Sequence, residues 1–167
     1  MQSDEIAPSN PLHPKRTGSA VESVVIDSEP ALSYVDDSDA EWHDAVTTAL
    51  LTPTRGCRFG SICVVERDTP VEIKGCIPEQ QNGRRSTVGR WFIKRDAHDR
   101  LEDERGVYWL TVYGPVPQTP ILAQRVVPAA VVGDLLEDSW YDNGREGVVG
   151  KLSWTTVIDE TEVSRRV

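Results

Sequence analysis

The sequence predicts an α/β domain with a mixed central sheet flanked by helices. Hydrophobic residues make up 38% of the chain and charged residues 27%, a balance typical of globular proteins. Runs of β-branched and aromatic residues alternate with segments of helical spacing. The 167 residues suffice for one domain with a core. We expect that domain over residues 23–158, between an unstructured tail at 1–22 and a frayed, charged tail at 159–167.

The first half of the chain predicts a helix followed by a β-hairpin. Val24–Ile26 is a short β-branched run and predicts an edge strand. Ala40–Leu51 predicts a helix that Pro53 ends, because apolar residues recur there at helical spacing. Residues 59–65 and 71–76 predict the two strands of a hairpin, with a turn between them.

The second half predicts a strand at the centre of the sheet and helices on either side of it in sequence. Trp91-Phe92-Ile93 leads into a helix at 94–104, and Val107–Tyr113 is apolar on both faces, as a central strand would be. The further expected elements are a polar loop at 78–88, a strand at 121–127, a helix from Pro128 to Leu136, a glycine-rich loop at 140–150 and a last strand at 151–158.

Charge is distributed unevenly along an acidic chain. The formal net charge is −9, which by itself argues against a nucleic-acid partner. Residues 84–95 nevertheless carry five basic side chains and no acidic one, and this local field matters more to a ligand than the total. With 14 Arg but only 4 Lys, and 14 Asp, the composition indicates a halophilic source with a high-salt cytoplasm.

Several classes of site and location are disfavoured. Three cysteines without a C-x-x-C pair predict buried free thiols rather than a disulfide framework or a zinc ribbon. Phosphate-binding glycine motifs, G-x-S-x-G and H-E-x-x-H do not occur, and three scattered histidines do not support a histidine-based triad. No apolar run is long enough to span a bilayer and no signal pattern begins the chain, so we expect a cytoplasmic protein without a membrane partner.

The strand Val71-Glu72-Ile73-Lys74 carries the strongest chemical signal. Residues i and i+2 of a strand share a face, so Glu72 and Lys74 project together. A carboxylate beside an ammonium can bind a divalent metal and steady a phosphate oxygen. The alternative is an edge strand with a solvated ion pair.

Basic residues after this strand suggest where phosphate would bind. Lys94 and Arg95 begin the predicted helix at 94–104, and a helix N-terminus flanked by cations is a natural phosphate site. Arg84 and Arg85 lie in the predicted polar loop, which is either an arm that contacts phosphate or a solvated loop.

The order of these elements resembles the restriction-endonuclease-like superfamily, the PD-(D/E)XK nucleases, over residues 38–136. Glu72-Ile73-Lys74 would be the E-x-K motif, and the segments 92–98 and 107–113 are similar to the helix and strand that follow it in several members. The resemblance implies an α-β-β-β-α-β core and an endonuclease that hydrolyses phosphodiester bonds in DNA with Mg²⁺ or Mn²⁺. It also implies a homodimer, as in many members of the superfamily.

The resemblance implies a role for each site residue. Glu72 and Lys74 would be catalytic, while Glu72, the carbonyl of Ile73 and Glu41 would hold the metal. Arg84, Arg85, Arg90, Lys94 and Arg95 would contact the DNA backbone. One departure is Ser61, which occupies the place where the family has an Asp on the strand before E-x-K. Either the alignment slips, or Glu41 supplies the second carboxylate, or the site has lost its metal.

Two other functions remain open on the sequence. A catalytically degenerate member of the same fold would bind nucleic acid or act in assembly without cleavage, and Ser61 favours this alternative. A protein-interaction domain with no nucleic-acid partner is the other, and the net charge of −9 favours it.

Overall fold

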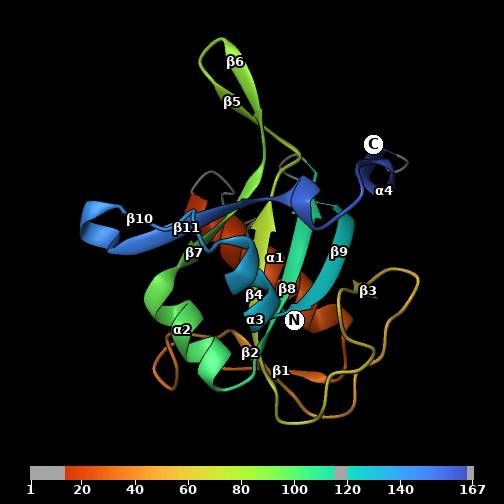
Figure 1. The fold of residues 1–167 in the computed structure, drawn as a ribbon. Helices are drawn as coiled ribbons and strands as arrows, with labels where there is room; N and C mark the ends of the chain where they lie inside the picture. The colour runs from red at the N-terminus through yellow and green to blue at the C-terminus, as the bar shows by residue number, and fades with distance from the viewer. Residues whose placement is uncertain (1–13, 115–119, 165–167) are drawn as a thin grey trace, which may run out of the picture.

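The computed structural model describes residues 14–114 and 120–164, which form a mixed α/β fold (Figure 1). The described residues build a six-stranded sheet in the order β1-β2-β4-β8-β9-β3. The β4–β8 and β3–β9 pairs are parallel and the others antiparallel, so the predicted mixed sheet is confirmed. The strands are β1 (Leu32–Tyr34), β2 (Ala45–Thr47), β3 (Arg58–Phe59), β4 (Pro70–Cys76), β8 (Val107–Tyr113) and β9 (Ile121–Pro128).

Helices cover both faces of this sheet (Figure 1). Helix α1 (Pro14–Ser28) packs its buried Val25 in a cluster with Ile73 and Trp109. Helices α2 (Arg95–Asp103) and α3 (Ala129–Leu135) lie on the other face, in the larger cluster around Tyr108 and Leu110. Strand β8 is therefore buried on both faces, as its continuous apolar sequence predicts.

A second, three-stranded sheet adjoins helix α2. It consists of β10 (Tyr141–Asp142), β11 (Val148–Ser153) and β7 (Arg90–Lys94), all antiparallel. The 3₁₀ turn η1 (Gly144–Glu146) connects β10 to β11, and η2 (Trp154–Thr156) follows β11. In β7 the buried residues Trp91 and Ile93 alternate with Arg90, Phe92 and Lys94, which face outward.

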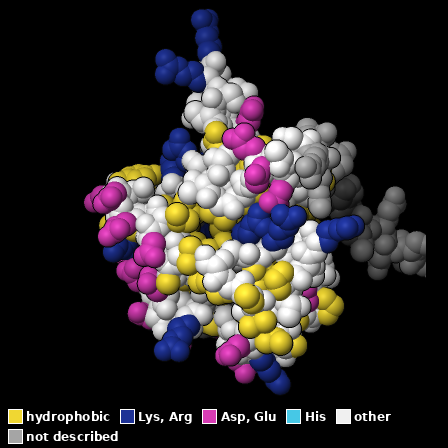
Figure 2. Space-filling view, turned by 45° about the vertical axis from the view of Figure 1, so that its right-hand side comes forward, with side chains coloured by type: hydrophobic (Ala, Val, Ile, Leu, Met, Phe, Trp, Pro, Cys, Tyr) yellow, Lys and Arg dark blue, Asp and Glu magenta, His cyan; other side chains and the backbone are white. Residues whose placement is uncertain are grey.

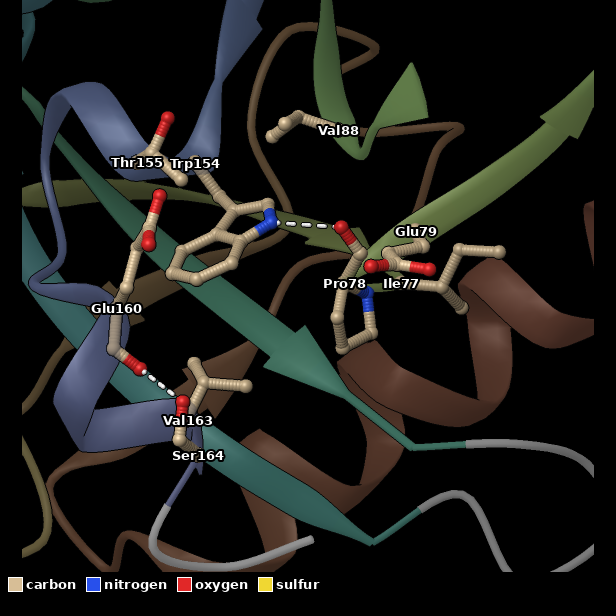
Figure 3. Close-up of a pocket in the computed structure, with 9 residues that line it drawn as sticks. All are labelled: Ile77, Pro78, Glu79, Val88, Trp154, Thr155, Glu160, Val163 and Ser164. Atoms are coloured by element: carbon tan, nitrogen blue, oxygen red, sulfur yellow. Dashed lines mark hydrogen bonds between the residues drawn. The ribbon is translucent and has the colours of Figure 1, made fainter. Parts of the chain in front are cut away.

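Strands β5 (Glu79–Asn82) and β6 (Arg85–Val88) form a two-stranded arm that projects from the body of the molecule (Figure 1). Its base is tightly held. The indole Nε1 of Trp154 donates a hydrogen bond of 2.9 Å to the carbonyl of Pro78 (Figure 3). A Cβ at Gly89 would lie 1.6 Å from the carbonyl oxygen of Ile77, so only glycine fits where the arm rejoins the body.

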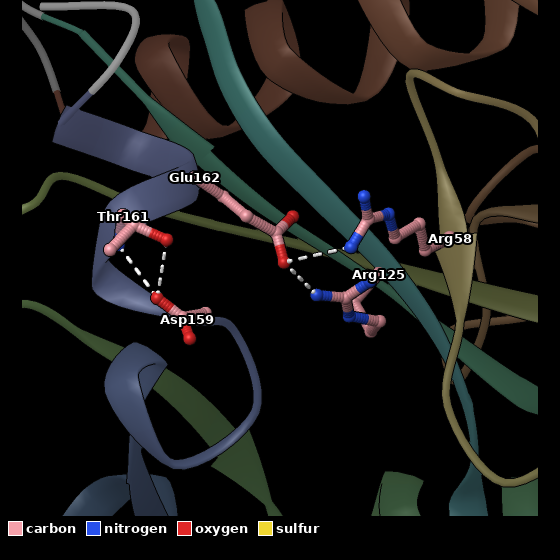
Figure 4. A network of polar contacts seen from close by, with 5 residues as sticks. All are labelled: Arg58, Arg125, Asp159, Thr161 and Glu162. Atoms are coloured by element: carbon pink, nitrogen blue, oxygen red, sulfur yellow. Dashed lines mark hydrogen bonds and ion pairs between the residues drawn. The ribbon is translucent and has the colours of Figure 1, made fainter.

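The C-terminal helix α4 (Glu160–Ser164) is attached to the main sheet by charge (Figure 4). The carboxylate of Glu162 accepts a hydrogen bond of 2.6 Å from Arg125 on β9 and lies 3.8 Å from the guanidinium of Arg58 on β3. Val163 is buried. The prediction of a frayed tail from residue 159 is therefore wrong over this helix, because it is fixed by an ion pair and an apolar contact.

The N-terminal half differs most from the prediction. Residues 14–22, expected in the unstructured tail, and Val24–Ile26, expected as an edge strand, belong to α1, whose buried positions Val21 and Val25 are four residues apart. The rest of the expected tail, residues 1–13, lies outside the described residues. The helix predicted over Ala40–Leu51 is wrong, because that segment contains β2, with Ala45 and Thr47 buried on one face at a period of two.

The hairpin predicted from residues 59–65 and 71–76 is also wrong. Strand β3 pairs in parallel with β9, whereas β4 pairs with β2 and β8. The residues predicted as a polar loop at 78–88 instead contain the β5–β6 arm, in which Gly83 takes the positive φ that the tight turn requires.

Elements with long, regular patterns are confirmed. They are strand β4, helix α2, strands β8 and β9, and helix α3. The last strand, predicted at 151–158, is only partly confirmed, because β11 begins at Val148 within the predicted glycine-rich loop and ends at Ser153, where η2 follows. The α-β-β-β-α-β order is present as α1, β1, β2, β4, α2 and β8. Cys57 and Cys76 are buried free thiols as expected, but Cys63 is exposed. No helix in the described part of the chain is long and apolar enough to cross a membrane.

Candidate active site

The candidate site lies in a fork between β2 and β4. Strand β2 pairs with β4 only at Val71 and Pro70, so the edge of β4 beyond Val71 is open on this side. Asp44, the residue before β2, fills the mouth of the fork: its backbone N–H donates to the carbonyl of Val71 at 3.0 Å. Its Oδ2 accepts a hydrogen bond of 2.7 Å from the backbone N–H of Ile73.

Glu72 and Lys74 project together from β4, as predicted from the strand period. The ammonium of Lys74 contacts the carboxylate of Glu72, and their side chains are 28% and 11% exposed. Both therefore lie mostly out of water, which excludes the alternative of a solvated edge pair. The N–H of Ile73 points into the fork, and the carbonyl of the same residue points to the same side of the strand.

Burial is the largest influence on the charges of this cluster, and neighbouring carboxylates add to it. Burial raises the pKa of Glu72 to about 8 even though Lys74 opposes the shift, and the carboxylate of Asp44 raises it further. Burial lowers the pKa of Lys74, but the charges of Glu72, Asp44 and Glu22 outweigh it, so the pKa ends above its ordinary value. Lys74 therefore carries its charge at neutral pH, while the carboxylates still lack a full complement of positive charge.

Glu22 is a further acidic residue of this cluster. It is half-buried on α1, one residue after Val21, which packs against Gly75 of β4. Burial, then the charge of Asp44, raises the pKa of Glu22 to about 7, while Lys74 lowers it. The first helix of the fold thus brings a carboxylate within electrostatic range of the fork.

Glu41 reaches the same region by a different route from the one predicted. It is not on a helix but in the irregular segment before Asp44. It lines a pocket of about 160 Å³ together with Glu72, Lys74, Lys94 and Tyr108. The structure therefore brings Glu41 to the predicted strand residues, although its assignment to the first helix is wrong.

Ser61 has no part in this site. It is exposed, has a positive φ of 68°, and follows β3 at the far edge of the sheet. Three strand spacings, on the order of 14 Å, separate β3 from β4. Ser61 therefore does not stand in the place of a carboxylate, and of the three alternatives weighed above, the slipped alignment is the one that the fold supports.

The predicted basic residues occupy three positions. Arg84 is in the turn of the β5–β6 arm and Arg85 next to it on β6, and Figure 2 shows basic side chains at the outer end of the arm. Arg90 and Lys94 lie on the outward face of β7. Arg95 is partly engaged elsewhere, because it pairs with Asp99 at 3.6 Å and lies 5.0 Å from the ring of Trp140.

A larger pocket lies on the other side of the arm and is chemically unlike the fork. It measures about 820 Å³ and is bounded by the arm base, η2 and α4 (Figure 3). Among the described residues its lining is mainly apolar, with two carboxylates, Glu79 and Glu160, and no Lys or Arg. Such a lining repels phosphate, so size alone does not make this pocket the chemical site.

The fork fits the divalent cation that the resemblance implies. Asp44, Glu72 and the carbonyl of Ile73 supply hard oxygen donors, which Mg²⁺ prefers. Burial, and then the carboxylate of Asp44, raises the pKa values of Glu72 and Glu22, so both carboxyl groups favour a proton, and a bound cation would take the place of that proton. Within the described part of the chain, no three Asp, Glu, His or Cys side chains form a ready-made cage. Mg²⁺ commonly binds through one or two carboxylates plus waters and phosphate, so two carboxylates suffice.

Asp44 and Glu22 are the residues that sequence reasoning missed. Asp44 precedes Glu72 by 28 residues and falls within the segment predicted as a helix. The three residues of β2, Ala45–Thr47, are too few for a period to be recognised, so no local sequence signal places Asp44 at a strand end. Glu22 lies in a segment whose early Pro, Ser and Asp content suggested a tail.

Comparisons with known proteins agree with this geometry. The model of the PD-(D/E)XK nuclease superfamily domain matches residues 8–159. Searches of curated proteins and of solved structures returned no match. The fork between β2 and β4 and the contact of Glu72 with Lys74 agree with a family match that covers most of the chain. The chain therefore belongs to the PD-(D/E)XK nuclease superfamily.

Proposed function

We propose that this protein is a metal-dependent endonuclease that hydrolyses phosphodiester bonds in DNA. The observation that carries the proposal is the convergence of Asp44, Glu72 and Lys74 on the open edge of β4. Two carboxylates and an ammonium, mostly withdrawn from water, form a setting in which charge on a scissile phosphate can be balanced.

The residues of the fork have distinct roles in this proposal. Asp44, Glu72 and the carbonyl of Ile73 would hold Mg²⁺ or Mn²⁺, with Glu22 or Glu41 adding a further oxygen. A bound divalent ion lowers the pKa of a water molecule and neutralises charge on phosphate. Asp44 also holds the backbone of β4 through its hydrogen bond to Ile73, and this contact positions the neighbouring Glu72.

Lys74 is the group that would orient the attacking water or stabilise developing charge. Its raised pKa keeps the ammonium charged at neutral pH, and its contact with Glu72 fixes its position. The cations at the outer end of the arm and along β7 would hold the DNA backbone, which positions the substrate without reading its sequence.

The degenerate alternative rested on Ser61. In this proposal Asp44 would supply the carboxylate that Ser61 seemed to replace, so Ser61 no longer favours a degenerate site. A degenerate protein would bind DNA and not cut it, and an interaction domain would do neither, so the two alternatives separate in one assay.

The test is cleavage of mixed DNA substrates with Mg²⁺ or Mn²⁺ in high salt, with folding checked by circular dichroism. The wild type should cut, and Lys74→Ala should lose at least about 100-fold in rate because charge stabilisation is lost. Arg67→Ala is the matched control, since Arg67 is an exposed cation in the turn before β4.

No metal-dependent cutting by the folded wild type would overturn the proposal. Equal cutting by Lys74→Ala would also remove Lys74 from the site. Sedimentation velocity in the same buffer tests the homodimer that the resemblance implies.

A further inference from the structure

We propose that the groove between the arm and the β7–β11 sheet binds one unpaired DNA strand and leads it to the fork. This inference rests on the proposed nuclease function, which it deepens by naming the form of the substrate. The groove measures about 400 Å³ and is lined by Gln80, Asn82, Thr87, Arg90, Phe92 and Lys151. Among the described residues, no Asp or Glu side chain lines it.

The wall of the groove follows from the pairing of β5 with β6. Partners across an antiparallel pair share a face, so Gln80 and Thr87 lie on the same side as Asn82 and Arg85. Glu79 pairs with Val88 and lies on the opposite side, where both line the apolar pocket. The arm therefore keeps its one carboxylate off the groove and presents amides, a hydroxyl and a guanidinium toward it.

The floor of the groove combines cations with an aromatic ring. Arg90 and Phe92 share the outward face of β7, and Lys151 of β11 lies directly across from Phe92. Phe92 remains partly exposed although it sits at the middle of its strand. An exposed ring flanked by cations is the arrangement with which proteins stack bases and hold the phosphates between them.

This chemistry selects an unpaired strand over a duplex. In a duplex both faces of each base are covered by its neighbours, so a ring at the floor of a groove has nothing to stack on. A single strand offers base faces to Phe92, base edges to the amides of Gln80 and Asn82, and phosphates to Arg90 and Lys151. In a chain of net charge −9, a groove with cations and no carboxylate is a marked local excess of positive charge.

Lys94 joins the groove to the catalytic fork. It lies two residues after Phe92 on the same face of β7, and it also lines the pocket that contains Glu72 and Lys74. A strand that stacks on Phe92 and continues past Lys94 would therefore place a phosphate at the fork. We infer that the enzyme cuts single-stranded DNA or the unpaired part of a branched substrate.

The test is binding of fluorescein-labelled oligothymidylate, followed by fluorescence anisotropy in EDTA so that nothing is cut. Phe92→Ala should weaken binding by about 5- to 100-fold, the loss typical of one stacked base, and Phe92→Trp should restore it. Lys151→Gln should weaken binding. It should also lower the slope of log affinity against log salt by roughly the amount expected for one phosphate contact. Val88→Ala is the matched control on the opposite face of the arm and should bind normally.

Affinities for oligothymidylate that are unchanged in both Phe92→Ala and Lys151→Gln would overturn the inference, as would an equal loss in Val88→Ala. A duplex of the same length should bind more weakly than oligothymidylate and lose no affinity in Phe92→Ala. If Phe92→Ala fails to fold, the exposed Lys151→Gln still decides the matter. The assay is independent of catalysis. Strand binding without cutting would overturn the proposed function alone, and cutting with unchanged oligothymidylate affinity in both Phe92→Ala and Lys151→Gln would overturn this inference alone.

Discussion

The fork and the groove differ in how their charges are placed. In the fork, Glu72 and Lys74 are mostly buried and in contact, and Asp44 is tied to the backbone beside them. In the groove, Arg90 and Lys151 are exposed and lie on two paired strands, β7 and β11. The cations of the arm lie further from the body of the molecule. The charges of the fork are therefore close together and mostly buried, whereas those of the groove and the arm are apart and exposed to solvent.

Because of this difference, we expect substitutions in the two regions to change different quantities, the rate of cleavage in one and the affinity for DNA in the other. Buried charges interact strongly and shift one another's pKa values, so changes in the fork should act on the rate of cleavage. Exposed charges are screened by salt and act additively, so changes in the groove and the arm should act on affinity and on its salt dependence.

The largest effect should come from Asp44→Asn. It removes a carboxylate from the fork but keeps an oxygen that can accept the hydrogen bond from Ile73. We expect the cleavage rate to fall by about 100-fold or more, with oligothymidylate affinity unchanged. Single-turnover cleavage and anisotropy measure the two quantities, and Asp39→Asn, in the exposed segment before the site, is the control. A rate within a few-fold of the wild type would contradict the role given to Asp44.

A smaller effect should come from the double substitution Arg84→Gln and Arg85→Gln. The two side chains lie at the outer end of the arm, so their loss should weaken DNA binding at low salt by roughly 10-fold. The slope of log affinity against log salt should fall by about 1.4, the value for two contacts to a single strand. Cleavage at saturating DNA should not change. Arg145→Gln, in η1, is the matched control, and an unchanged slope would show that the arm cations are merely solvated.

The smallest effect should appear in the pH dependence of stability without divalent metal. The folded pKa of Glu72 is raised to about 8 and that of Glu22 to about 7, so the native state binds more protons than the unfolded state above the ordinary value of 4.5. Stability should therefore fall as the pH rises from about 6.5 to about 8.5. This range avoids the opposite contribution of His98, whose pKa is lowered by burial.

The same substitution that slows cleavage should reduce this pH dependence. Asp44→Asn removes a charge that raises both pKa values, so the decline should be shallower by on the order of 1 kcal/mol over the range. Chemical denaturation at several pH values, in EDTA, measures it. A flat profile in the wild type would mean that the fork carboxylates are not held out of water.

The sequence was sufficient where a pattern was long and local. Strand β8 is a continuous apolar run, and helix α2 places Ala97 and Leu101 four residues apart on one face, so both elements could be predicted. Glu72 and Lys74 are two residues apart on one strand, so the pair could be predicted as well. Their family resemblance rested on this contiguous stretch. Glu72 and Lys74 lie in this stretch and could be predicted, whereas their neighbours Asp44 and Glu22 lie outside it.

The rest depended on contacts that no local pattern records. Strands β2 and β3 have three and two residues, too few for a period, and β3 pairs with β9 more than 60 residues away. Asp44 was hidden for the same reason, because it meets Glu72 only through the pairing of β2 with β4. A run of apolar residues around β2 happens to match helical spacing, and tertiary pairing overrides it.

The tight base of the arm has a consequence for how this protein can change over time. Gly89 and Trp154 fix where the arm begins, so one face of the arm always points to the groove and the other to the apolar pocket. The side chains of either face can therefore be substituted without changing those of the other. Insertion or deletion is another matter. One extra residue between Pro78 and Glu79 would shift the alternation of β5 by one, turning Glu79 toward the groove and Gln80 toward the apolar pocket. Diversification of this arm should therefore proceed by substitution, or by gaps of two residues.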